Sequence, residues 1–189
     1  GEFLFQNPRD RIETDRADDE EILRDRLEHR GSLVHELRER RRQWLEASAL
    51  LQDALQPPVE HDVAMDRFVR TTRRLSRGRA VALLATDNTE ADTLAVDPED
   101  VKDVNEALEV LRSSVQMAPH SPVVMTTTGR FHAVVVPLRS PLVPVQALVV
   151  LTDRDHAPLD IDEREMLASF ADQAILAVDR AQAISDREE

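Results

Sequence analysis

The chain has 189 residues, a hydrophobic content of 41% and a formal net charge of −13 at pH 7. This length allows one buried core with a helical extension, and the acidic balance argues against a nucleic-acid-binding face, which needs clustered Lys and Arg. The absence of cysteine excludes disulfides, thiolate metal sites, cysteine nucleophiles and thioether-linked chromophores.

The N-terminal segment is polar and acidic, and we interpret residues 1–20 as a linker that opens with a cloning remnant, Gly-Glu-Phe. A long helix is expected to begin near Asp18–Glu21, because helix N-termini favour acidic side chains. No apolar run approaches the roughly 18 residues that span a bilayer, and no signal peptide is recognisable. We therefore expect a cytoplasmic protein without a membrane span.

Residues 21–56 carry a heptad pattern with dense Glu and Arg between the seam positions. These positions are Leu23, Leu27, Arg30, Val34, Leu37, Arg41, Trp44, Ser48, Leu51 and Leu55. The pattern predicts a parallel, dimeric coiled-coil signalling helix. Gly31 and the two seam arginines weaken this coil, which suits a signalling joint, and Pro57 with Pro58 ends the helix.

Residues 57–189 are expected to form one domain of helices and short strands. The expected elements before the centre of the sheet are a helix from Asp62 to near Gly78, strands Ala80–Thr86 and Thr93–Val96 around a turn at 87–91, a helix from Pro98 to Val115, a loop at 117–122 and a strand Val123–Met125.

Two Val-rich runs, Phe131–Leu138 and Val143–Leu151, predict adjacent buried strands of one hairpin. Because the runs are apolar almost throughout, we expect helices on both faces of the sheet. Asp160 and Glu163 form a capping-box pattern that should open the last helix. This helix is expected to continue into a downstream domain.

The order of these elements resembles a GAF domain, the small-molecule sensory module of bacterial signalling proteins. Arg42–Ser48 is similar to the entry helix of GAF domains from actinobacterial sensor kinases, Val136–Arg139 to their conserved strand, and Asp160–Ala181, with Phe170–Ala174, to their exit helix. The resemblance covers residues 42–185.

This resemblance implies an α+β fold with a GAF-like central antiparallel sheet, helices on both faces and a preceding long coiled-coil helix. It implies a non-catalytic sensory and transmission module of a two-component sensor histidine kinase, dimeric and placed between upstream and downstream domains. The expected homodimer interface consists of Leu37, Trp44, Leu51, Phe170, Ala174, Ala177 and Ala181.

The chain departs from the family at the central hairpin, where Ser140-Pro141-Leu142 and Gln146 replace the usual glycines. Gln146 should crowd a standard pocket. The Asn-Lys-Phe-Asp signature of cyclic-nucleotide-binding members is absent, and bilin attachment and methionine-sulfoxide reduction both need cysteine. A ligand-free dimerisation scaffold of another multidomain protein, such as a phosphatase or a cyclase, is therefore the alternative. An independent enzyme is a third possibility, without candidate catalytic residues.

The polar cluster from Thr126 to Arg130, just before the central hairpin, is the candidate ligand site. Hydroxyls, a glycine and an arginine can hold an anionic or carbonyl-bearing ligand. The predicted contacts are Thr126, Thr128, Arg130 and His132. The competing interpretation is a polar loop with a solvated Arg130.

The histidines give weaker indications. His35 lies in a partial phosphoacceptor box, but Glu39-Arg40 replaces the expected Thr-Pro or Asn-Pro, so a polar flank of the coil is preferred. His120 or His132 would be candidate haem ligands, although an ordinary histidine is the better interpretation of each. His61 and His156 have no ligand-spaced partners, so no metal site is predicted.

Overall fold

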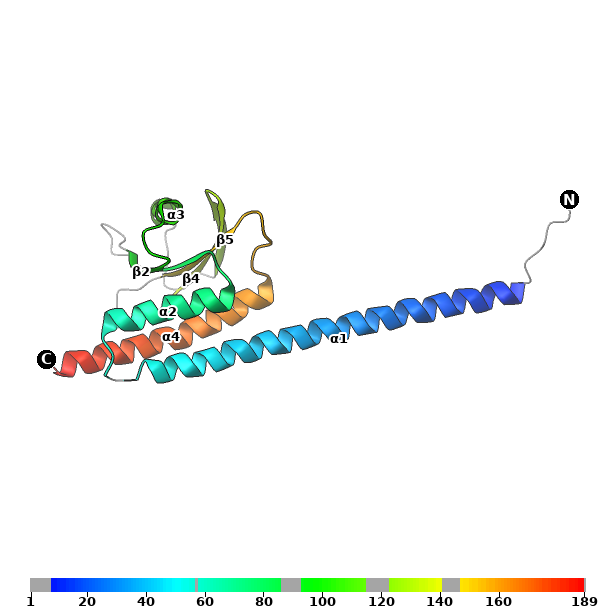
Figure 1. Cartoon of the computed structure of the whole chain (residues 1–189), viewed down its shortest axis with the longest axis horizontal. Helices are drawn as coiled ribbons and strands as arrows, with labels where there is room; N and C mark the ends of the chain where they lie inside the picture. Colours follow the sequence, from blue (N-terminus) through cyan, green and yellow to red (C-terminus); the bar gives the residue numbers. More distant parts are fainter. Residues whose placement is uncertain (1–7, 57, 86–92, 115–122, 141–146, 189) are drawn as a thin grey trace. The chain divides into compact units, whose positions relative to one another are not determined.

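The structure, a computed structural model, describes residues 8–56, 58–85, 93–114, 123–140 and 147–188 (Figure 1). Its contacts divide the chain into two compact units, Gly1–Arg42 and Gln43–Glu189, which are described separately. The elements are α1 (Pro8–Ala54), α2 (His61–Ser76), β1 (Ala80–Leu84), β2 (Thr93–Asp97), α3 (Lys102–Ser114), β3 (Val124–Thr128), β4 (Phe131–Pro137), β5 (Ala147–Asp153) and α4 (Ile161–Glu188).

In the first unit, α1 begins at Pro8, well before the start expected near Asp18. Most of the segment expected to be a linker is therefore helical. The physical reason is that proline suits a first helical position, and neither Pro nor Gly follows before Gly31 to break the helix. The side chains of Leu23, Leu27 and Val34 are exposed in this unit.

The second unit is built on a five-stranded antiparallel sheet with strand order β2-β1-β5-β4-β3. The expected hairpin is confirmed: β4 and β5 pair over their full lengths, with Val134 opposite Val150. The pairing of β1 with β2 is confirmed as well. The turn at 87–91, the loop at 117–122 and the start of the last strand at 143–146 lie outside the described residues.

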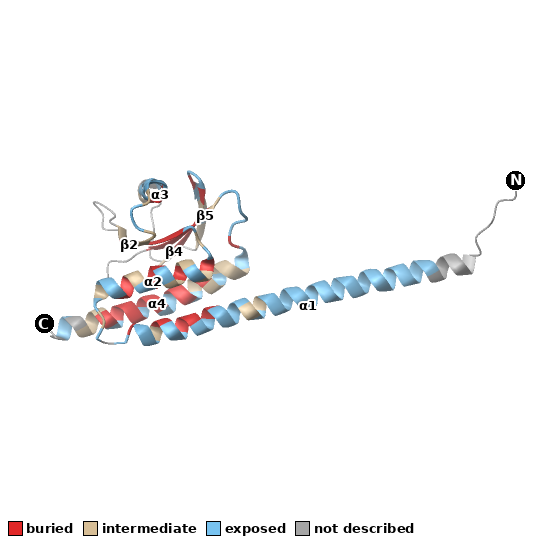
Figure 2. Ribbon diagram, viewed as in Figure 1, coloured by how far each residue is buried: buried red, intermediate tan, exposed pale blue. Residues whose placement is uncertain are grey.

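Alternating side chains of the sheet enter two hydrophobic cores, which confirms helices on both faces (Figure 2). Val81, Val134 and Val150 join α2, α4 and the C-terminal part of α1 on one face. Ala82, Val135 and Val149 join α3 on the other. Every strand residue from Ala80 to Leu84 is buried, as expected for a strand covered on both sides.

Several element boundaries differ from expectation for local reasons. The helix expected from Pro98 begins at Lys102, since Asp100 has a φ of 58°, outside the right-handed helical region. β3 extends to Thr128 instead of ending at Met125, because it pairs with β4 up to a turn at Gly129. At the start of α4, the Glu163 N–H donates to Asp160 Oδ1 at 2.8 Å, so the expected side-chain cap is present.

Candidate transmission site between the entry and exit helices

An aromatic cluster joins three helices of the second unit. The ring of Trp44, on the C-terminal part of α1, meets Phe170 of α4 edge to face at a centroid distance of 5.4 Å. Phe68 of α2 meets the same Phe170 ring at 6.1 Å, also edge to face. Phe170 is therefore the common contact of α1, α2 and α4.

A polar contact lies farther along the seam between α1 and α4. The buried Ser48 Oγ–H donates to Gln173 Oε1 at 2.6 Å. Trp44 contacts Phe170, and Ser48, one turn later in α1, contacts Gln173, about one turn later in α4. The two helices therefore run parallel. A hydrogen bond inside an otherwise apolar seam favours one register of the two helices, because another register would leave Ser48 without its partner.

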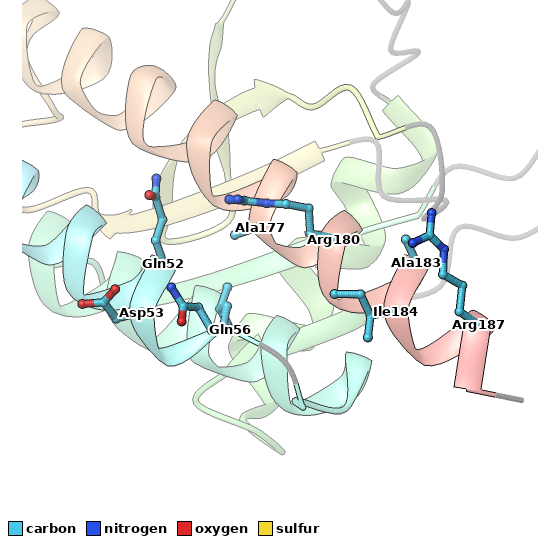
Figure 3. A pocket seen from close by; sticks show the side chains of 9 residues that line it. Gln52, Asp53, Gln56, Ala177, Arg180, Ala183, Ile184 and Arg187 are labelled. Carbon is cyan, nitrogen blue, oxygen red and sulfur yellow. The ribbon is translucent and has the colours of Figure 1, made fainter.

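Beyond this contact, a groove of about 360 Å³ lies between the two helices (Figure 3). Gln52 lines it from α1 and Gln56 from the segment just after α1, whereas Arg180, Arg187 and Ala177 line it from α4. In Figure 3 the Arg180 side chain extends from α4 toward the α1 side of the groove. A molecule in this groove would contact the entry and exit helices at once.

The residues expected at a dimer interface are mostly buried inside the single chain. Leu37 is half-buried in the first unit. Five others belong to the core cluster of the second unit: Trp44, Leu51, Phe170, Ala174 and Ala177. Ala181 is buried as well. Packing within the protomer accounts for their burial without a second copy, and their role in dimerisation stays a prediction.

The helix pair also carries exposed apolar side chains that sequence reasoning missed. Leu45 is 67% exposed, Leu50 is 66% exposed and Leu176 is 56% exposed. Leu45 directly follows Trp44 and lies about 100° around the helix from it, outside the heptad seam. Their exposure becomes clear only from the structure, in which the seam residues of α1 pack against α4 and these leucines do not.

The predicted ligand cluster is split by the sheet. Thr126 and Thr128 pair with Ala133 and Phe131 and face the α3 side. His132 pairs with Thr127 and faces the opposite side, because neighbouring residues of a strand alternate between faces. The structure therefore does not bring His132 together with the two threonines.

Two members of the predicted cluster already have protein partners. The buried Thr128 Oγ1–H donates to the Ala107 carbonyl at 3.2 Å, which ties β3 to α3. Arg130 Nη1 lies 3.2 Å from Asp103 Oδ2, again on α3, and both side chains are largely exposed. These contacts position α3 on the sheet, and the ligand-binding role of the cluster stays a prediction.

The other candidate residues receive no new support. His35 is exposed on α1, whereas His120 and Gln146 lie outside the described residues. Within the described ranges, no three His, Cys, Asp or Glu side chains gather in a way that could hold a metal ion. Of the helices that the structure describes, none combines the length and apolarity needed to cross a bilayer.

No family model and no curated protein matches the chain. Solved structures do match. The GAF domain of a candidate sensor histidine kinase from Pseudomonas syringae pv. tomato has a TM-score of 0.55 at 13% identity, and the match covers 79% of this chain and 92% of that one. The GAF domain of a phosphoenolpyruvate-protein phosphotransferase from Coxiella burnetii has a TM-score of 0.52 at 12% identity, with coverage of 77% and 98%. The expected GAF-like α+β fold is therefore confirmed.

Proposed function

We propose that the chain is a non-catalytic GAF-type sensory and signal-transmission module of a larger cytoplasmic protein, with α1 as its entry helix and α4 as its exit helix. The parent protein that we propose is a sensor histidine kinase of a two-component system. The similarity to the GAF domain of a candidate sensor histidine kinase supports this choice of parent.

The parallel contact between α1 and α4 carries the proposal. Trp44 and Ser48 on entry contact Phe170 and Gln173 on exit within one core. A displacement of α1 must therefore either move α4 or break these contacts. Couplings of about 1–3 kcal/mol are typical of such allosteric links. Bound ligand or an upstream domain would supply the displacement.

We further propose a homodimer formed by the exposed heptad residues of α1. Leu23, Leu27 and Val34 lie at seam positions, with Arg30 between Leu27 and Val34, and all three apolar side chains are exposed in the single chain. Exposed apolar side chains that recur at heptad spacing indicate a partner surface. Leu37 continues the seam. In this dimer, the contact between Trp44 and Phe170 would hold α4 in place against α1. The exposed Leu45 and Leu176 lie on the surface of these two helices.

One observation favours the alternative, a ligand-free dimerisation scaffold of another multidomain signalling protein such as a phosphatase or a cyclase. Among the described residues, the space between α3 and the sheet is filled by apolar side chains, including Phe131, Leu108 and Leu111. In the same region, the Thr128 hydroxyl donates a hydrogen bond to the backbone of α3. A ligand pocket between α3 and the sheet could open only if these side chains moved apart.

Native mass spectrometry of the purified chain separates the two functions. Both predict twice the protomer mass of 21.4 kDa. A dimer that carries additional small-molecule mass supports the sensor, whereas a bare dimer supports the scaffold. A bare monomer at micromolar concentration would contradict the dimeric relay in either form.

A further inference from the structure

A polar cluster around the buried Asp179 side chain lies away from the aromatic contact and draws on three segments of the second unit. It consists of His61 at the start of α2, Ser140 just after β4, and Asp179 on α4. The Asp179 side chain is buried, with the residue only 5% exposed. The Ser140 hydroxyl donates to Asp179 Oδ1. A carboxyl group is rarely buried to this extent without a specific role or full pairing.

Two atoms of this cluster have no hydrogen-bond partner among the described residues. They are Asp179 Oδ2 and His61 Nε2, both inaccessible to solvent. Most buried polar side-chain atoms are paired, and leaving one unpaired is unfavourable. A positive charge on His61 lowers the pKa of Asp179, but the unpaired atoms Nε2 and Oδ2 are not hydrogen-bonded to each other.

Of the charged groups near Asp179, His61 of α2 acts on it electrostatically. The exposed Asp62 carboxylate lies 3.9 Å from the Nδ1 atom of His61. Ser140 faces it from the end of β4 with a neutral hydroxyl. Its sequence neighbour Arg180 is exposed and lines the groove toward α1, and Arg139, next to Ser140, is exposed as well.

We propose that Ser140 and the buried Asp179 form a protonation-linked latch that ties α4 to the segment after β4, and that this latch loosens when Asp179 loses its proton. In the protonated state, the carboxyl group is neutral, so its burial is less costly, and Oδ1 keeps the Ser140 hydrogen bond. In the ionised state, a buried negative charge remains with one oxygen unpaired.

The direction of the effect follows from burial. Desolvation raises the pKa of Asp179, and the Ser140 hydrogen bond and the charge of His61 oppose this rise only in part. An acid whose pKa is raised in the folded state stabilises the fold fully below its unfolded value, which is about 3.9 for Asp. This stabilisation is lost as the pH rises through the folded pKa. The latch is therefore looser at neutral pH than in mild acid.

The test compares wild type with Asp179→Asn, which keeps an acceptor for Ser140 but cannot ionise. Urea unfolding is followed by the emission of Trp44, the only tryptophan of the chain, from about pH 4.5 to about pH 8. We expect the ratio of the unfolding constants, wild type over variant, to increase with pH. A ratio that stays constant would contradict the latch. The matched control is Asp172→Asn, an exposed acid of the same helix, which should show no such trend.

A second variant pair keeps the proposal testable if Asp179→Asn folds poorly. Ser140→Ala removes a donor that lowers the pKa of Asp179, so the loss of stability with rising pH should become larger than in wild type. His61→Gln should change the unfolding constant by a factor that differs between the wild-type and Ser140→Ala backgrounds. Independent, pH-insensitive effects of the two changes would show that the cluster is only packing.

Discussion

Phe170→Ala is expected to lower the free energy of unfolding of the Gln43–Glu189 unit by about 3–5 kcal/mol, the usual range for truncating a buried Phe. Phe170 is only 3% exposed, and its ring meets both Trp44 and Phe68. Each aromatic pair adds about 0.5–1.5 kcal/mol beyond the buried area, which favours the upper part of the range. The truncation would leave a cavity at the point where α1, α2 and α4 meet.

Equilibrium urea unfolding, recorded through Trp44 emission, measures this loss. Leu176→Ala is the matched control, because Leu176 lies on the same helix but is 56% exposed. The control should change the unfolding free energy by no more than about 0.5 kcal/mol. If the two variants lose similar amounts, Phe170 is not the shared contact of the three helices.

The double variant Leu27→Glu, Val34→Glu is expected to convert the proposed dimer into a monomer. In a parallel coiled coil, both positions lie in the seam, so each pair of glutamates would face its copy in an apolar interface. An unpaired charge in such an interface carries a desolvation penalty of several kcal/mol, in addition to like-charge repulsion. The stability of the second unit should stay unchanged, since these side chains are exposed in the single chain.

The control is Ile22→Glu, Leu33→Glu, which introduces the same charge at two exposed apolar positions outside the seam. The starting exposures are comparable, 50% and 51% in the control against 67% and 48% in the test pair. Sedimentation equilibrium of both variants gives the molar masses. Equal dissociation by the two variants would show that general charge repulsion, and not the heptad seam, governs association.

The sheet was predictable because its pattern has few alternative explanations. Val-rich runs at Phe131–Leu138 and Val143–Leu151 are too short for buried helices and too apolar for surface strands. Their described parts, in β4 and β5, pair as expected. The early start of α1 at Pro8 was not predictable from charge pattern alone, since polar, acidic segments fit a linker and a solvated helix equally well.

The site was harder to predict, because hydrophobic periodicity shows which face of a helix is buried but not which segment packs against that face. The stripe through Trp44 and Leu51 fits a partner chain as well as it fits α4, and in the structure α4 and α2 cover it. His132 appeared close to Thr128 in sequence, but strand alternation places them on opposite faces. The contact between Ser140 and Asp179 joins distant segments and had no local signature.

Disulfide trapping at Val34 tests the central claim, that the entry helices pair in parallel, most directly. The 189-residue chain has no cysteine, so Val34→Cys places one thiol in each protomer. A parallel seam brings the two copies of this position close enough for a disulfide, which needs Cβ atoms about 3.5–4.5 Å apart. We predict a covalent dimer on mild oxidation with Val34→Cys and little with Glu36→Cys, which lies on the far face of the helix. Equal yields from both variants, or no covalent dimer from Val34→Cys, would contradict the parallel relay.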